Sequence, residues 1–138
     1  MKISKTEIEK YIPQRRPFVM IDSLSDGTPE KFETDFLILS DNIFLEEGVL
    51  REFALIENIA QTSSAGISVY QKYGHTKPAD GFIGGISKLK LYALPKVNDT
   101  IHTVVYLVTQ FQNMFLLRGE NYLNGEKLLE CELKLVGV

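Results

Sequence analysis

The sequence predicts an α+β fold in which a curved antiparallel sheet is wrapped around one long central helix. Three observations support this prediction: residues 49–73 form a long and unusually apolar helical pattern, two strand-like segments precede it, and four follow it. Strands grouped around a single helix are typical of a two-layer α+β domain. Because one sheet cannot cover so apolar a helix completely, we expect the protein to be at least a dimer.

The composition is typical of one globular domain, which we expect to span residues 1–138. The 15 basic and 18 acidic residues give a net charge of −3, and the isoelectric point near 5.4 argues against a nucleic-acid-binding protein. A single cysteine excludes a disulfide scaffold and indicates a reducing compartment. One Cys and two His are too few for a Cys/His zinc site, and we expect no metal and no cofactor.

The N-terminal residues 1–11 predict a short helix, which Pro13 ends. These residues lack the apolar core of a secretion signal. The longest apolar region of the chain is interrupted by charged residues, so we expect no membrane-spanning segment. Together these features favour a cytoplasmic protein.

Two strands are predicted before the central helix. Residues 17–24 form an apolar run that the turn sequence Ser25-Asp26-Gly27 closes, and residues 31–39 are its predicted hairpin partner. Residues 40–48 show no clear period.

The central helix is predicted over residues 49–73, where apolar side chains recur every three or four positions. Further apolar residues widen this face well beyond a surface stripe, which indicates that the helix is buried on most sides. Gly74 is well suited to follow the last turn, and residues 75–80 form a predicted loop.

Four strands are predicted after the helix. They cover residues 82–93, 100–111, 113–123 and a last segment that includes Leu129 to Leu135. The sequence Asn124-Gly125 predicts a tight hairpin turn before the last strand. Cys131 lies on the apolar face of that alternating strand, so we interpret its thiol as a small core residue.

Three segments of the chain carry a resemblance to a known family. Residues 12–22, the opening motif, read IPQRRPFVMID, and residues 56–61, the helix motif, read IENIAQ. A third segment runs from Gly85-Ile86 to Asn98-Asp99. In order and spacing these segments resemble the beta-hydroxyacyl-acyl carrier protein dehydratases of the hotdog superfamily. That family typically shows Leu-Pro-His-Arg-x-Pro-Phe, then Glu-x-x-Ala-Gln, then a strand and turn ending in Pro-Gly-Asp. The resemblance implies the hotdog fold over most of the chain.

The resemblance also implies an acyl-thioester substrate, bound to acyl carrier protein or CoA, in fatty-acid or polyketide-type biosynthesis. In the family the acyl chain lies in a tunnel at the dimer interface. A histidine before the helix and a carboxylate on the helix, from opposite subunits, remove water from a 3-hydroxyacyl group. Glu57 matches that carboxylate, which makes it the candidate general acid or base of a lyase.

The residues around Glu57 support this interpretation independently. Phe53, Glu57 and Gln61 follow one another at i, i+4 steps, so they share one stripe of the helix. A carboxylate on so apolar a helix suits general acid–base chemistry, and Gln61 is placed to orient it. The alternative is that Glu57 is a buried polar anchor between subunits.

Further candidate residues flank the site. Phe53 shares the stripe of Glu57, and glycines at the start of a strand that would pass Glu57 permit close approach of a thioester. The candidate substrate-binding residues are Phe53, Gly84, Gly85 and Ile86. A local basic cluster would steer an acidic carrier protein, although scattered surface charge is the alternative. The candidate carrier-protein contacts are Arg15, Arg16, Lys88 and Lys90.

The family histidine is not found at its usual place. The family has Gly-His-Phe-Pro-Gly before the helix, whereas residues 41–48 read DNIFLEEG, and Gln14 stands where the opening motif usually has a histidine. His75 lies in the predicted loop after the helix, and His102 lies in a strand, where a hydrogen-bonded structural role is the simpler interpretation. The shorter loop, with its Asn-x-Phe sequence, resembles a branch of these dehydratases associated with polyene-pigment and related polyketide pathways. In that branch paired hotdog subunits sometimes divide the catalytic work.

Three hypotheses about function follow. In the first, the chain is a dehydratase-like enzyme in which Glu57 protonates the leaving hydroxyl and His75 or a partner chain supplies the base. In the second, it is a hotdog acyl thioesterase that uses Glu57 and a backbone N–H at a helix start near Gly48-Val49. In the third, it is a non-catalytic acyl-binding or partner subunit of a dehydratase pair. We expect a homodimer, a higher homo-oligomer, or a heterodimer with another hotdog subunit.

Overall fold

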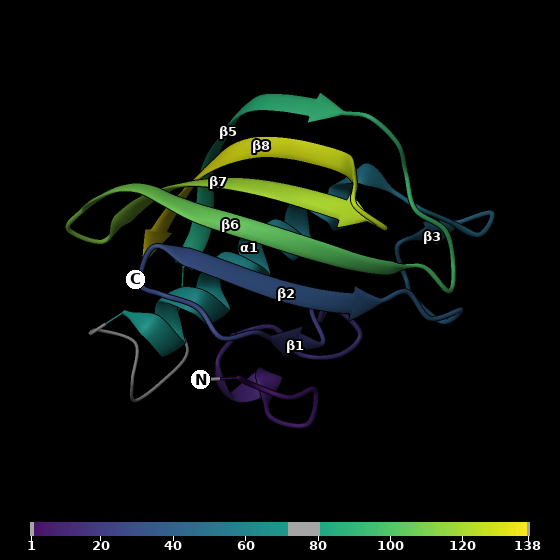
Figure 1. Cartoon of the computed structure of the whole chain (residues 1–138), viewed down its shortest axis with the longest axis horizontal. Helices are drawn as coiled ribbons and strands as arrows, with labels where there is room; N and C mark the ends of the chain where they lie inside the picture. Colours follow the sequence, from purple (N-terminus) through teal and green to yellow (C-terminus); the bar gives the residue numbers. More distant parts are fainter. Residues whose placement is uncertain (1, 72–80, 138) are drawn as a thin grey trace.

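The computed structural model describes residues 2–71 and 81–137, which form a curved antiparallel sheet wrapped around one helix (Figure 1). The six-stranded sheet has the order β1-β2-β6-β7-β8-β5, and β3 and β4 form a separate two-stranded hairpin. The elements in chain order are η1 (Ile8–Lys10), β1 (Ser23–Leu24), β2 (Lys31–Leu37), β3 (Leu45–Glu46), β4 (Val49–Leu50), α1 (Glu52–Tyr70), β5 (Gly81–Leu91), β6 (Thr100–Phe111), β7 (Met114–Leu123) and β8 (Glu126–Gly137).

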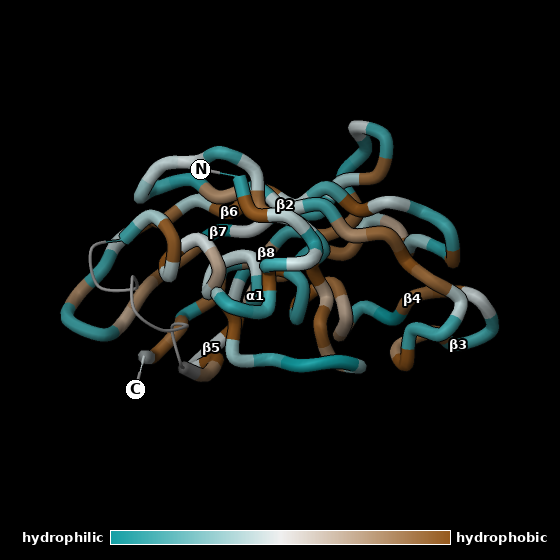
Figure 2. The backbone as a smooth tube through the Cα atoms, turned by 90° about the horizontal axis from the view of Figure 1, so that it is seen from below, coloured by the Kyte–Doolittle hydropathy of each residue, from teal (hydrophilic) through white to brown (hydrophobic). Residues whose placement is uncertain are grey.

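The strands after the helix agree closely with the sequence prediction. β5, β6 and β7 match the predicted segments to within two residues at each end. β8 extends the last predicted strand in both directions. The tight turn is confirmed as well, since Asn124 and Gly125 have φ values of 50° and 83°. Hydrophobic and hydrophilic segments follow one another along the chain (Figure 2), and over much of β8 buried residues alternate with less buried ones, which gives this strand a buried and an outward face.

The segment before β2 differs from the prediction. Residues 17–24 were predicted as a strand, but only Ser23–Leu24 pair with β2. The predicted N-terminal helix is reduced to the single turn η1, and Ile3 pairs with Leu24. Instead of a neighbouring strand, the Phe18 carbonyl and both backbone groups of Met20 bond to side chains of α1.

The central helix is shorter than predicted. It begins at Glu52 and ends at Tyr70, because Val49–Leu50 pair with Leu45–Glu46 as strands β4 and β3. Gly74 and the predicted loop 75–80, which includes His75, lie outside the described residues. No helix in the described ranges is long and apolar enough to cross a membrane.

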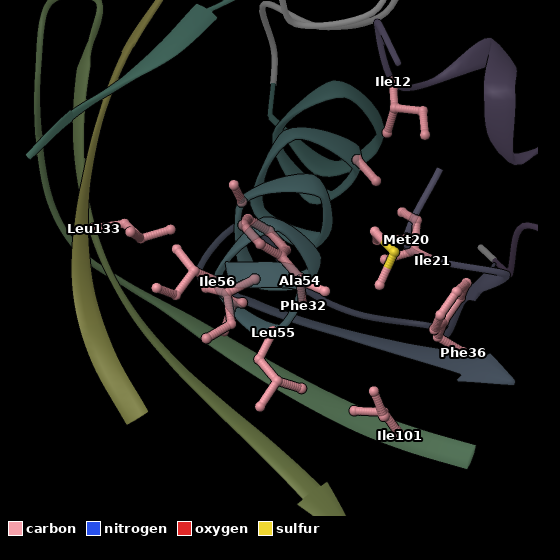
Figure 3. Packing of buried hydrophobic residues seen from close by; sticks show 14 of the residues in the cluster. Ile12, Met20, Ile21, Phe32, Phe36, Ala54, Leu55, Ile56, Ile101 and Leu133 are labelled. Carbon is pink, nitrogen blue, oxygen red and sulfur yellow. The ribbon is translucent and has the colours of Figure 1, made fainter. Parts of the chain in front are cut away.

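The core lies between α1 and the concave face of the sheet (Figure 3). Buried side chains from β2, β6 and β8, including Phe32, Ile101 and Leu133, belong to the same cluster as the helix residues Leu55 and Ile56. Phe32 packs directly on Gly66, where a Cβ atom would overlap the Phe32 ring. This close approach fixes the position of α1 on the sheet, because protein interiors leave little free space for a shift.

Candidate active site

Glu57 lies near the middle of the first half of α1, at the border between the buried and the open side of the helix. Its side chain is half-buried, and one turn earlier Phe53 is 56% exposed. One turn later Gln61 is fully buried, with its Nε2 atom 3.4 Å from Glu57 Oε1. The predicted stripe therefore runs from solvent at Phe53 into the core at Gln61. Among the described residues, Gln61 is the hydrogen-bond partner of the Glu57 carboxylate.

Gln61 binds the opening motif more closely than it binds Glu57. Its Nε2 donates to the Phe18 carbonyl at 2.8 Å, and its Oε1 accepts from the Met20 backbone N–H at 2.6 Å. The expected role of Gln61 as an orienting residue is therefore shared, since the same amide nitrogen faces both Phe18 and Glu57. Residues 18–20 are held against α1 beside the candidate carboxylate.

The rest of the opening motif stabilises the local fold. Arg15 Nη1 donates to the carbonyls of Ile12 at 2.9 Å and Gln14 at 2.8 Å. Asp22 Oδ2 accepts from the Leu37 backbone N–H at 2.8 Å, which anchors the motif to the end of β2. These bonds give Arg15 and Asp22 structural roles within the chain.

Aromatic side chains flank the open side of Glu57. Phe18, whose carbonyl shares the Gln61 amide with Glu57, is 54% exposed. Phe44 and Phe53 pack against each other with ring centroids 5.8 Å apart. Exposed aromatic surface next to a half-buried carboxylate is typical of a site that another molecule covers.

The candidate residues on β5 lie at a free edge of the sheet. β5 pairs with β8 on one side only, and the pairing shifts between Ile83 and Gly85, which leaves Gly84 at a bulge. A Cβ atom at Gly85 would meet no atom within 4 Å, so its backbone is open to approach. Ile86 is 45% exposed and lies opposite Leu133 of the core, so it is on the helix-facing side of the sheet.

The four candidate carrier-protein contacts do not lie together within the chain. Arg15 and Arg16 precede β1, whereas Lys88 and Lys90 are on β5, at the opposite edge of the sheet. Lys88 Nζ lies 3.5 Å from Glu132 Oε2, and Lys90 lies opposite Glu130 on β8. The predicted basic cluster is therefore not formed within a single chain.

A cavity of about 140 Å³ lies on the other side of the opening motif, between η1 and β2. Arg16, Val19, Phe36 and Asn42 contribute to its lining, and Glu57 does not. Asn42, in the loop that lacks the family histidine, has its Oδ1 engaged by the Phe44 backbone N–H at 2.8 Å. An amide cannot exchange protons near neutral pH, so Asn42 does not replace the family histidine as a base.

His102 has a structural environment, as predicted. Its Nδ1 is 3.0 Å from Asp35 Oδ1 and its Nε2 is 2.9 Å from Glu33 Oε1, on the face of the sheet opposite α1. Partial burial lowers the pKa of His102, but the hydrogen bonds and charges of Asp35 and Glu33 outweigh burial and raise the pKa above its usual value. Cys131 is buried in the core as predicted, and burial raises the pKa of its thiol to about 11.

The sequence analysis missed Asn58, which is fully buried beside Glu57 and bonded to three other elements of the fold. A polar residue at a core-facing position of an otherwise apolar helix was the available signal. No group of three or more His, Cys, Asp or Glu side chains that could hold a metal ion occurs within residues 2–71 and 81–137.

Comparison with known proteins gives consistent results. A family model described as ApeP-like, ApeP dehydratase, matches residues 6–137. The 3-hydroxyacyl-[acyl-carrier-protein] dehydratase FabZ of Enterococcus faecalis is 25% identical over 143 positions, covering 96% of each chain. FabZ of Rickettsia massiliae is 28% identical over 138 positions, covering 96% of this chain and 94% of that relative.

Solved structures confirm the predicted hotdog fold. The dehydratase heterocomplex ApeI:P from Xenorhabdus doucetiae superimposes with a TM-score of 0.86 at 17% identity, covering 95% of this chain and 90% of that one. A hypothetical thioesterase from Streptococcus pneumoniae, solved with coenzyme A, gives a TM-score of 0.66 at 11% identity, covering 83% and 86%.

Proposed function

The chain belongs to the ApeP-like dehydratase family, and we propose that Glu57 is the residue through which it removes water from a 3-hydroxyacyl thioester. The chain is a hotdog dehydratase-like protein related to 3-hydroxyacyl-[acyl-carrier-protein] dehydratases, which are lyases. The observation that carries the proposal is the half-buried Glu57 carboxylate, held by Gln61 and flanked by exposed aromatic rings.

Dehydration breaks two bonds of the substrate. A base takes the proton from the carbon next to the thioester carbonyl, and the hydroxyl on the following carbon leaves as water after an acid protonates it. The electron pair of the broken C–H bond forms the new C=C bond. In our proposal Glu57 gives its proton to the departing hydroxyl. Gln61 holds the carboxyl group in place through its Nε2 atom.

Two residues of this chain are unsuitable as the base. His102 is on the face of the sheet away from α1, and Asn42 cannot exchange protons near neutral pH. We therefore propose that a second hotdog subunit supplies the base across the interface. The dehydratase ApeI:P, which is a heterocomplex, supports a paired arrangement.

The free edge of β5 supports the same arrangement. Four of its apolar side chains are more than 40% exposed: Phe82, Ile86, Leu89 and Leu91. A long edge strand with exposed apolar side chains is an aggregation hazard unless another chain covers it. We propose that the second hotdog subunit covers this edge and brings its own residues to the open side of Glu57.

The carrier of the acyl group is part of the proposal. The FabZ relatives are named for acyl-carrier-protein substrates, and the structure of the pneumococcal thioesterase was determined with coenzyme A. Both carriers present an acyl thioester on a pantetheine arm. We propose an acyl carrier protein as the natural carrier, because the family match and the curated relatives both point to dehydratases of this kind.

Turnover of a 3-hydroxyacyl carrier-protein thioester tests the proposal. The purified chain is assayed alone and together with a second hotdog subunit from the same pathway, and formation of the 2-enoyl product is followed by the loss of one water in mass spectrometry. We expect Glu57→Gln to lower the rate at least about 100-fold. Glu52→Gln, at an exposed glutamate in the first turn of α1, is the matched control and should leave the rate unchanged. No dehydration, and no hydration of the enoyl thioester, in either mixture would contradict the proposal.

The thioesterase hypothesis lacks the oxyanion donor at the predicted position. The helix start near Gly48-Val49 was the expected oxyanion donor, but α1 begins at Glu52, and Val49 belongs to β4. The pneumococcal thioesterase likeness supports this hypothesis at the level of the fold alone. Release of free thiol in the same assay would favour the thioesterase function. Thermal stabilisation by acyl thioesters without turnover would favour the non-catalytic subunit.

A further inference from the structure

We propose that Asn58 is a positioning residue for Glu57, because its side chain fastens α1 both to residues 18–20 and to the centre of the sheet. This inference rests on the proposed role of Glu57. Asn58 is fully buried, yet its side-chain amide makes three hydrogen bonds that reach three separate parts of the chain.

The first bond joins α1 to the opening motif. Asn58 Nδ2 donates to the Met20 carbonyl at 2.6 Å. The backbone N–H of the same residue, Met20, donates to Gln61 Oε1 at 2.6 Å, and the Phe18 carbonyl accepts from Gln61 Nε2 at 2.8 Å. Two side-chain amides of α1 thus replace the backbone partner that a neighbouring strand would give residues 18–20.

The other two bonds join α1 to the sheet. Asn58 Oδ1 accepts from Thr103 Oγ1 of β6 and from Asn121 Nδ2 of β7, the latter at 3.0 Å. Thr103 and Asn121 are directly opposite each other in the β6–β7 pairing, and Asn121 Nδ2 also lies 3.0 Å from Thr103 Oγ1. The three side chains form one buried polar cluster on the central strands.

This cluster determines the direction in which Glu57 points. Successive residues of an α-helix are rotated by about 100° around its axis, so a helix that turns Asn58 onto the sheet holds Glu57 at the border of the open side. Gln61 completes the link, since its Nε2 contacts both Phe18 and Glu57. Loss of the Met20–Asn58 bond removes one of the three bonds that hold residues 18–20 on α1, and we expect this loosening to reach the Glu57 carboxylate through Gln61.

A buried amide is not needed merely to stabilise the helix. An apolar side chain at this position would bury its surface without any polar group to satisfy, whereas an unmatched amide in the core is unfavourable by about 1–3 kcal/mol. The hydroxyl groups of Thr34 and Thr62, whose oxygens are 2.6 Å apart, form a buried polar contact to which we assign a structural role only. It joins α1 to β2 without contacting residues 18–20, which makes Thr34→Val a matched control.

A double-mutant cycle between Asn58 and Glu57 tests the proposal. Asn58→Ala should lower kcat between about 10-fold and 100-fold with KM nearly unchanged, because a displaced catalytic group weakens the chemical step more than binding. In the Glu57→Gln background Asn58→Ala should have no further effect, since the residue acts through Glu57. Thr34→Val should lower the melting temperature and leave kcat unchanged. An equal loss of kcat from Asn58→Ala in both backgrounds, or a loss from Thr34→Val as large as that from Asn58→Ala, would overturn the proposal.

Hydrogen exchange gives a second readout that does not depend on turnover. We expect the Met20 amide to exchange faster in Asn58→Ala than in the wild type, with no such change in Thr34→Val. Thr103→Val, which removes one donor to Asn58 Oδ1, replaces Asn58→Ala if that variant does not fold, and should show the same changes more weakly. Equal protection of Met20 in all variants would contradict the proposal. If the wild-type mixture is inactive but Met20 exchanges faster in Asn58→Ala, the proposed function is contradicted. The structural link from Asn58 to residues 18–20 would still hold.

Discussion

The two sides of α1 differ in how completely the rest of the chain covers them and provides hydrogen-bond partners. On the sheet-facing side, Gly66 packs against Phe32, and the side-chain amide of Asn58 bonds to β6, β7 and residues 18–20. On the open side, Phe53 is more than half exposed and Glu57 is half-buried. The chain therefore completes its own core but leaves its candidate site half built, as expected if a second chain supplies the other half.

The free edge of β5 is a second region that the chain leaves uncovered. Exposed apolar side chains gather on this strand, whereas apolar side chains of β2, β6 and β8 such as Phe32, Ile101 and Leu133 are buried in the core. We expect substitutions of apolar residues on the sheet-facing, closed side to act on folding and those on the open side to act on assembly and turnover, whereas Asn58 links the two sides. The predictions below test this expectation.

Substitution of Gly66 should have the largest effect on folding. In Gly66→Ala the new methyl group would overlap the Phe32 ring, which is fully buried and cannot move away. Overpacking of this kind destabilises by about 1–3 kcal/mol or more, and the gain in helix propensity of about 1 kcal/mol offsets only part of it. We expect a net loss of about 2 kcal/mol in the free energy of unfolding, measured by urea denaturation. Gly85→Ala, on the open edge, is the control and should change it by less than about 0.5 kcal/mol. A Gly66→Ala variant as stable as the wild type would show that the closed side is not tightly packed.

Substitution at the β5 edge should act on assembly. Ile86→Lys places a charge on the edge that we propose to be covered by a second subunit. Because central interface residues contribute about 1–2 kcal/mol or more, the dissociation constant should rise at least about 10-fold. Analytical ultracentrifugation of the mixed subunits measures this change. Phe111→Lys, at a more exposed apolar residue at the end of β6, should leave assembly unchanged. Equal weakening by both variants would place the interface elsewhere.

His102 should make stability depend on pH. A neutral imidazole has only one N–H and cannot donate to both Glu33 and Asp35, so the folded geometry favours the protonated ring. Because the folded-state pKa of His102 is raised, its contribution is fully present below the usual value of 6.5 and is lost as pH rises through the folded value. The melting temperature of the wild type should fall over this range more steeply than that of His102→Gln. Parallel curves would exclude a contribution from His102. The effect should be small, because the ring is 42% exposed.

The smallest expected effect is the slow reaction of the Cys131 thiol with an added thiol reagent. Burial raises the pKa of this thiol to about 11, and a thiol reagent needs both the thiolate and access. In the folded protein at pH 8 the thiol should react far more slowly than in urea, as followed by the absorbance of the released reagent. Rapid reaction in the folded state would show that the closed side opens readily.

The sequence predicted the elements whose signals are local. The long helix and the strands after it follow from the spacing of apolar residues, and the i, i+4 spacing of Phe53, Glu57 and Gln61 correctly placed these residues on one stripe. The strand predicted over residues 17–24 was wrong for most of its length. Its backbone partners are the side chains of Asn58 and Gln61, which are about 40 residues away in the chain and leave no periodic signal.

The candidate site was predictable in part for the same reason. The spacing that marks the helix motif is visible in one chain, but sheet order is not, so the separation of Arg15 and Arg16 from Lys88 and Lys90 could not be foreseen. We propose that a second subunit supplies the group that completes the site. The sequence of this chain alone therefore cannot identify that group.

The structure of the assembled pair tests the central claim most directly. If the chain is one half of a dehydratase, a titratable side chain of the second subunit, a histidine or a carboxylate, should face Glu57. Its proton-bearing atom should lie within hydrogen-bond reach of Glu57 directly or through one water, a separation of about 3–5 Å. A second subunit that presents only apolar side chains to Glu57 would contradict the account and favour a non-catalytic acyl-binding subunit.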